Sequence, residues 1–167
     1  MEDRTFGPIR FLAGENRGRY PFCHSLYIEG AGVLIDPASS RERLLRLRAE
    51  EEVKMIWLSH WHEDHFMHLD LFDDLPLWVS LEDAPPLADL DVLMTWYGLN
   101  EEEKQVWGPL LLEQFHFRPR KPVRYLVDGE LIHLGGLSVG GDRDPGSHPR
   151  PSLLLLPGTI RSLRGGL

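Results

Sequence analysis

The sequence predicts an α/β domain in which helices cover a β-sheet. Apolar runs typical of strands alternate with helical segments along the first 80 residues, and this alternation favours a layered α/β architecture. The chain has 167 residues, of which 42% are hydrophobic, so one domain can bury a substantial core. No window reaches about 18 uncharged apolar residues, so we expect no membrane span.

The predicted elements follow one another in a regular order. Short apolar runs predict strands at 9–13, 23–28, 33–35, 53–58 and 75–79. Glu29–Gly32 separates the second and third strands and predicts a hairpin. Ser39 lies three residues before Glu42, which is the spacing of a capping box, and an amphipathic helix with Leu44, Leu45 and Leu47 is expected after it.

Residues 82–120 differ from the preceding alternation. They predict an insertion with two helices, at 87–97 and 101–115, the second capped by Asn100. Its aromatic residues allow two interpretations, which are a packed helical hairpin that covers the sheet and a lid over a substrate. A further helix is expected at 64–72, and residues 123–139 return to strand patterns.

Charge and cysteine content exclude several classes of protein. The formal net charge of −8 argues against a nucleic-acid-binding protein, because such proteins neutralise phosphates with Lys and Arg. Cys23 is the single cysteine and cannot form an internal disulfide, so we expect a reducing compartment such as the cytoplasm. The N-terminal residues contain no long apolar run, so no signal peptide is expected.

Candidate metal ligands lie directly after the strand predicted at 53–58. Within the segment 59–65, His60, His62, Asp64 and His65 place three imidazoles and a carboxylate within six positions. A loop at a strand end can bring such side chains together, where ligands of α/β proteins usually bind. Imidazole and carboxylate are ligands that Zn²⁺ favours, and iron or manganese also fit. The alternative is a solvated loop that is rich in histidine.

The pattern His60-x-His62-x-Asp64-His65 after an apolar strand resembles the metal-binding motif of the metallo-β-lactamase-fold superfamily. The upstream segments agree, including the run 33–37 that contains Asp36. Glyoxalase II-like hydrolases look similar through these segments. The resemblance covers residues 8–140 and implies an αββα sandwich, of which this chain supplies the N-terminal half to two-thirds.

The resemblance also implies roles for these residues. His60 and His62 would bind one metal ion, and Asp64 and His65 a second. Asp64 would also act as the catalytic residue that orients the attacking water, while Asp36 would hold the loop without binding metal. The implied activity is zinc-dependent hydrolysis of a small-molecule ester, thioester, lactone or phosphodiester. The alternative function is a catalytically impaired remnant that binds metal weakly, possibly as a partner-binding module.

The remaining histidines and the cysteine carry weaker expectations. We expect His68 to face solvent, although its spacing from His65 would allow it to approach the site. His24 could lie near the pocket, whereas His116 and His133 lie in no motif and are not expected to be functional. Cys23 is expected to be a small core residue.

The composition changes after residue 141. Residues 142–167 carry a net charge of +2, against −10 for residues 1–141. If the codons of residues 144–152 are read one nucleotide later, they permit Thr-Pro-Gly-His-Thr-Pro-Gly-His, a motif of the superfamily. We therefore expect a metallo-β-lactamase-like domain at 1–141 and an out-of-frame tail at 142–167. The alternative is a natural short variant with a basic tail.

Overall fold

The computed structural model describes residues 2–127, 129–134, 137–142 and 152–154. Its strands are β1 (Arg4–Phe6), β2 (Ile9–Leu12), β3 (Ser25–Ile28), β4 (Val33–Ile35), β5 (Met55–Trp57), β6 (Leu77–Ser80), β7 (Arg124–Leu126), β8 (Leu131–Leu134), β9 (Leu137–Asp142) and β10 (Ser152–Leu154). Its helices are η1 (Glu15–Gly18), α1 (Arg41–Glu50), α2 (Glu63–Phe66), η2 (Leu69–Phe72), α3 (Ala84–Ala88), α4 (Leu90–Trp96) and α5 (Glu101–Glu113).

The strands form two sheets. The larger has seven strands in sequential order, β1 to β7, which are antiparallel from β1 to β4 and parallel from β4 to β7. The smaller sheet has the order β10-β9-β8 and is antiparallel. The parallel half matters for function, because the carboxyl ends of β4, β5 and β6 meet at one edge of the sheet.

Alternating side chains along the central strands point into two separate cores. On β4, Leu34 joins the core shared with the helices, whereas Val33 and Ile35 join a second core with Val139 of β9. On β5, Ile56 and Trp57 divide between the two cores in the same way. The period of two residues is that of a strand buried on both faces. The large sheet therefore lies between a helical layer and the small sheet.

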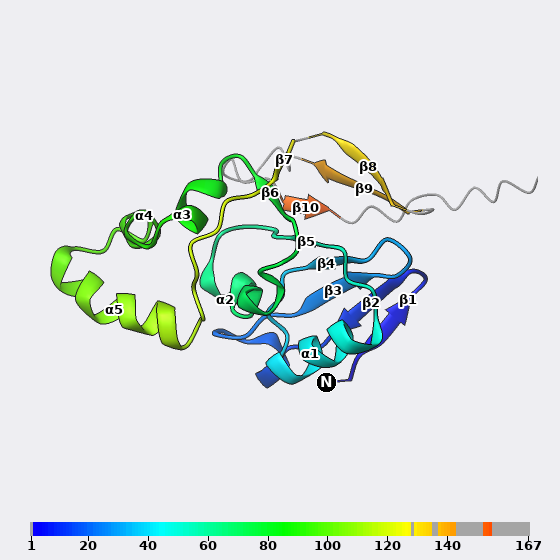
Figure 1. The fold of residues 1–167 in the computed structure, drawn as a ribbon, viewed down its shortest axis with the longest axis horizontal. Coiled ribbons are helices and arrows are strands. Elements are labelled where there is room, and N and C mark those ends of the chain that lie inside the picture. The colour runs from blue at the N-terminus through cyan, green and yellow to red at the C-terminus, as the bar shows by residue number, and fades with distance from the viewer. Residues whose placement is uncertain (1, 128, 135–136, 143–151, 155–167) are drawn as a thin grey trace, which may run out of the picture.

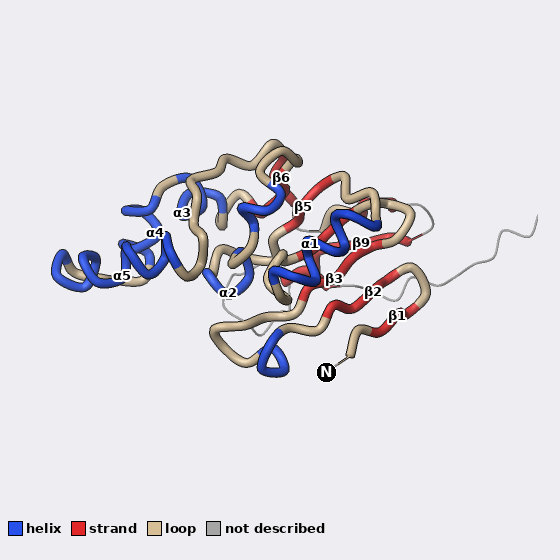
Figure 2. The backbone as a smooth tube through the Cα atoms, turned by 60° about the horizontal axis from the view of Figure 1, so that its bottom comes forward, coloured by secondary structure: helices blue, strands red, loops and turns tan. Residues whose placement is uncertain are grey.

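The figures show this arrangement. Helix α1 crosses one face of the large sheet (Figure 2). The group α3 to α5 lies at one end of the molecule, away from the β1–β2 hairpin, while β8 to β10 lie along the large sheet (Figure 1). The described residues thus form a helical layer and two sheets, which are part of the αββα sandwich that the resemblance implies.

Two helix predictions need correction. The N-cap of α1 is Ser40, whose side chain accepts a hydrogen bond from the amide of Arg43, so the cap lies one residue after the predicted Ser39. The helix predicted at 64–72 is two short helices, α2 and η2, separated at Met67 and His68. The amide of His68 donates to the carbonyl of Pro37, so the helical hydrogen-bond series is interrupted there.

The insertion is also more divided than predicted. The first of its two predicted helices is in fact α3 and α4, and Pro85 and Pro86 lie in the first turn of α3, where proline is tolerated. Asp89 ends α3 and caps α4 with its side chain. Asn100 caps α5 as predicted, in a capping box with Glu103.

Among the described residues, no helix has the length and apolar character needed to cross a lipid bilayer. Ser152–Leu154 pairs with Gly140–Asp142 as β10. The rest of the predicted out-of-frame tail, residues 143–151 and 155–167, lies outside the described residues.

Candidate metal centre

The candidate site lies at the carboxyl ends of two neighbouring parallel strands. Asp36 directly follows β4, and Ser59 lies two residues after β5. The amide of Asp36 donates to the carbonyl of Trp57, so the strand pairing continues up to the site. The loop from Ser59 then leads into α2, which begins at Glu63. This topology brings side chains from positions 36 and 59–65 to one edge of the sheet.

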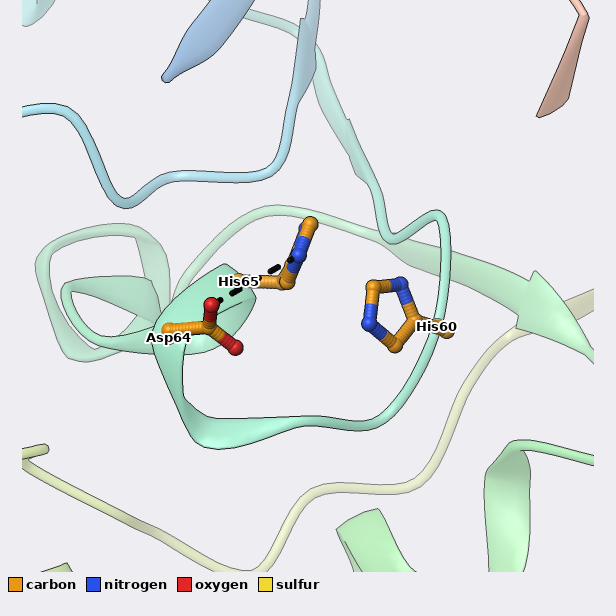
Figure 3. Close-up of side chains that lie close together, drawn as sticks. All are labelled: His60, Asp64 and His65. Atoms are coloured by element: carbon orange, nitrogen blue, oxygen red, sulfur yellow. Dashed lines mark ion pairs between the residues drawn. The ribbon is translucent and has the colours of Figure 1, made fainter. Parts of the chain in front are cut away.

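Three of the predicted ligands form a compact group. One ligand atom from each of His60, Asp64 and His65 lies within 4.8 Å of the others. Figure 3 shows the two imidazoles and the carboxylate arranged around one loop, with the ion pair between Asp64 and His65. His65 Nε2 lies 3.9 Å from Asp64 Oδ2. The group combines two imidazole nitrogens with one carboxylate oxygen, ligand types that suit a first-row divalent cation.

Asp36 fixes the orientation of His65. Asp36 Oδ2 lies 2.9 Å from His65 Nδ1, and since an ionised carboxylate only accepts, Nδ1 carries the proton. The same carboxylate accepts from the Ser59 amide at 2.8 Å and from Ser59 Oγ at 2.7 Å. Histidine ligands of metal ions commonly donate their other nitrogen to a carboxylate in this way. Asp36 therefore holds both the loop and the ring of His65.

The backbone at Asp36 is unusual. Its φ angle of 51° lies in the left-handed region, which is unfavourable for a residue with a Cβ. Ser25 Oγ donates to the carbonyl of Asp36 and accepts from the amides of Ala38 and Ser39, each at 3.0 Å. Ser25 is fully buried, so this turn is held from inside the domain. Such strained residues often occur at functional sites.

The surroundings shift the pKa values of two of these residues. Burial lowers the pKa of His65, but hydrogen bonds with Asp36 and Cys23 outweigh it and raise this pKa to about 10. Burial raises the pKa of the Asp64 carboxyl above its usual range. Cys23 Sγ lies 3.7 Å from His65 Nε2, so this cysteine contacts the candidate centre as well as the core.

His62 lies beside this group and faces the helical insertion. Its ring centroid is 4.8 Å from that of His60, and its ring stacks on Tyr97 at 5.8 Å. Tyr97 in turn contacts Trp61 at 4.8 Å and Trp107 at 6.4 Å. The leucines of the insertion pack into the core, as a helical hairpin that covers the sheet would, and its Tyr97 contacts His62.

Glu63 connects the site to two other segments. Its side chain is 4% exposed and accepts hydrogen bonds from the hydroxyls of Tyr20, at 2.7 Å, and Tyr97. Burial and the Glu63 carboxylate raise the pKa values of both tyrosines. Tyr20 and Tyr97 are far from Glu63 in the sequence. Tyr97 belongs to the aromatic residues noted in the insertion, but no motif predicts that either tyrosine contacts Glu63.

Several expectations for the other histidines were wrong or incomplete. His68 is 7% exposed and does not face solvent. Its ring lies 5.5 Å from that of His116, which no sequence motif singles out. His24 accepts a hydrogen bond from the amide of Gly14 at 2.9 Å, and a Cβ at Gly18 would lie 2.3 Å from the His24 ring. His24 therefore holds the loop that contains η1.

The chain belongs to the metallo-beta-lactamase superfamily, whose family model matches residues 18–158. A probable metallo-hydrolase of Streptococcus pyogenes serotype M6 is 30% identical in an alignment of 105 residues that covers 59% of this chain and 43% of that protein. The chain thus spans less than half the length of this curated relative.

Solved structures of similar fold agree with this assignment. A metallo-beta-lactamase from Cronobacter sakazakii with a mutated HARLDQ motif has a TM-score of 0.60 at 19% identity, covering 91% of this chain and 57% of the other. A beta-lactamase from Chitinophaga pinensis has a TM-score of 0.60 at 21% identity, covering 89% and 53%. A metallo-beta-lactamase family protein from Thermus thermophilus has a TM-score of 0.56 at 20% identity, covering 90% and 56%. These likenesses show the fold.

Proposed function

We propose that the chain is the metal-binding part of a zinc-dependent hydrolase. The observation that carries this proposal is the group of His60, Asp64 and His65 at the sheet edge, with Asp36 behind His65. The donor set suits zinc, and the second carboxylate supplies the hydrogen bond that zinc-ligating histidines commonly make. The relative from Streptococcus pyogenes, named a probable metallo-hydrolase, supports the same class of activity.

The four predicted ligands would hold one or two zinc ions. Bound zinc would lower the pKa of a water molecule so that it can attack an ester, thioester, lactone or phosphodiester near neutral pH. Asp64 would orient this water and accept its proton, and its raised pKa favours that exchange. Asp36 would keep Nδ1 of His65 protonated, so that Nε2 of the same ring is directed to the ion.

The helical insertion would contact the substrate. Tyr97 stacks on His62, and Trp96 lies 5.6 Å from Trp61, with 46% of its surface exposed. An exposed aromatic surface next to the candidate ligands suits a small molecule with a flat or apolar group. We propose a cytoplasmic enzyme with a small-molecule substrate, consistent with its acidic charge and single cysteine.

The proposal is tested by measuring bound zinc and hydrolysis together on the purified chain. A panel of thioester, phosphodiester and lactone substrates is compared for the wild type, the His60→Ala/His62→Ala variant and the His133→Ala control. His133 lies on exposed β8, far from the motif in sequence, so the control retains the candidate ligands. Zinc-dependent hydrolysis that only the double variant loses supports the proposal.

Two results of this measurement would contradict the proposal. Hydrolysis that survives His60→Ala/His62→Ala would show that the activity comes from elsewhere. A wild-type chain with neither bound zinc nor hydrolysis would support the alternative, which is a catalytically impaired remnant of the fold.

A further inference from the structure

The described residues contain a second group of metal-ligating side chains, formed by His68, Asp70 and His116. One ligand atom from each lies within 4.8 Å of the others, and the group shares no residue with the candidate centre. Ligand atoms on a tetrahedral zinc ion lie about 3.4 Å apart, given bonds of about 2.0–2.1 Å. Small side-chain rotations would therefore close the group around an ion.

The three side chains come from two segments that the fold brings together. His68 precedes η2, Asp70 lies within η2, and His116 follows α5 at the exit of the insertion. His116 has a φ angle of 52°, which is unfavourable for a residue with a Cβ. Met67 holds His116 in this conformation through its carbonyl, 3.0 Å from His116 Nδ1.

His68 has an unused polar atom inside the protein. Its side chain is buried, and Nδ1 has no hydrogen-bond partner among the described residues. A buried nitrogen without a partner is destabilising, so such groups call for a ligand, an ion or a water molecule.

The other two side chains are already oriented. Because the Met67 carbonyl only accepts, His116 Nδ1 carries the proton, and Nε2 of His116 keeps its lone pair for a metal ion. Asp70 accepts two hydrogen bonds from the guanidinium of Arg41, at 3.0 and 2.8 Å. This pair fixes the carboxylate, and each of its oxygens retains a further lone pair. The positive charge of Arg41 would weaken cation binding.

A small pocket beside Asp70 and His116 is lined by acidic, basic and apolar side chains. Asp73 lines the same small pocket as Asp70 and His116. Arg118 also lines it, so the pocket itself carries no large net charge. Apolar side chains close the remaining wall, and they are Phe66, Leu69, Leu87 and Phe117.

We propose that His68, Asp70 and His116 form a second zinc site, separate from the one at the sheet edge. The ion would join η2 to the exit of the helical insertion, which is 46 or more residues away in the sequence. Such a cross-link would stabilise the position of the insertion whether or not the chain catalyses hydrolysis. This inference therefore does not depend on the proposed function.

The test is the ¹¹³Cd NMR spectrum of the full chain loaded with ¹¹³Cd²⁺, a spectroscopic substitute for zinc. Three proteins are compared, which are the wild type, His116→Ala and the matched control His133→Ala. The proposal expects a cadmium signal that is present in the wild type and in His133→Ala and is lost in His116→Ala. The same cadmium signals in all three proteins would overturn the proposal. A fourth protein, His60→Ala/His65→Ala, identifies the signals of the sheet-edge centre, and the proposal is also overturned if the wild type shows only those signals.

A second variant serves as the test if His116→Ala does not fold. If circular dichroism shows that His116→Ala is unfolded, Asp70→Asn takes its place, because it removes the charged ligand with little change in volume. Loss of the same signal from a folded Asp70→Asn protein supports the site, and retention of that signal overturns it. If only the sheet-edge centre does not bind cadmium, the signals of that centre are absent and the signal of the second site remains. The two proposals can therefore be distinguished.

Discussion

Asp36, which directly follows β4, is joined to His65 of α2 by a hydrogen bond of 2.9 Å between Oδ2 and Nδ1. The two residues are 29 positions apart, and the same carboxylate also receives two hydrogen bonds from Ser59. One buried side chain thus sets the path of the loop and the orientation of a candidate ligand.

Replacing Asp36 by Asn should weaken zinc binding. The amide keeps the shape of the side chain but loses the negative charge that supports the Nδ1 proton of His65. We expect affinity to fall roughly 10- to 100-fold, as measured by titration against a chromophoric chelator. The control is Asp74→Asn, an exposed carboxylate paired with Arg48, which should leave affinity unchanged. Equal affinities in the two variants would contradict the role of Asp36.

The stability of the metal-free protein should depend on the charge of His65. Its pKa is about 10 in the folded protein and 6.5 as the ordinary value, so folding favours the protonated ring. This contribution is complete below pH 6.5 and is lost as the pH rises toward 10. Urea unfolding with excess chelator should show stability declining over this window in the wild type and less so in His65→Gln. An identical decline in both proteins would contradict this contribution of His65 to stability.

The hydrogen bonds of Glu63 should stabilise the contact between the loop and the insertion. Tyr97→Phe removes one donor to the buried carboxylate, and we expect a loss of about 1.5–3 kcal/mol in the free energy of unfolding. Tyr125→Phe is the matched control, since Tyr125 is 46% exposed. A double-mutant cycle with Glu63→Ala isolates the pair, and a coupling energy near zero would refute this interaction.

Helix α1 offers a test of the packing on its inner face. Leu44 is fully buried, whereas the adjacent Leu45 is 50% exposed. Leu44→Ala should destabilise the protein by about 2–5 kcal/mol because it leaves a cavity, and Leu45→Ala should cost far less. Chemical unfolding of both variants measures the difference, and similar values would mean that α1 lies on the sheet in another orientation.

The sequence predicted the fold where local patterns and topology agree. Val33–Ile35 forms a strand as expected, and the motif after β5 lies at the sheet edge. The break at His68 could not be predicted, because it depends on a hydrogen bond from its amide to Pro37, which is distant in the chain. Propensity favours one continuous helix there, and tertiary contacts override it.

The candidate site was predictable only in its local part. His60, Asp64 and His65 lie within six residues, so spacing alone suggests that they meet. Cys23, Tyr20 and His116 contact residues of the two candidate sites or of their loops through long-range packing, and single-sequence periodicity carries no information on such contacts. They become visible only when the segments are placed in space.

If the side chains of the motif bind zinc, the zinc content of the dialysed chain depends on them. The wild type and the Asp64→Asn/His65→Gln variant are loaded with zinc, dialysed against buffer and analysed by inductively coupled plasma mass spectrometry. We predict that the wild type retains at least one more zinc ion per chain than the variant, whether or not the second site is filled. Equal zinc content in the two folded proteins would show that Asp64 and His65 do not bind zinc.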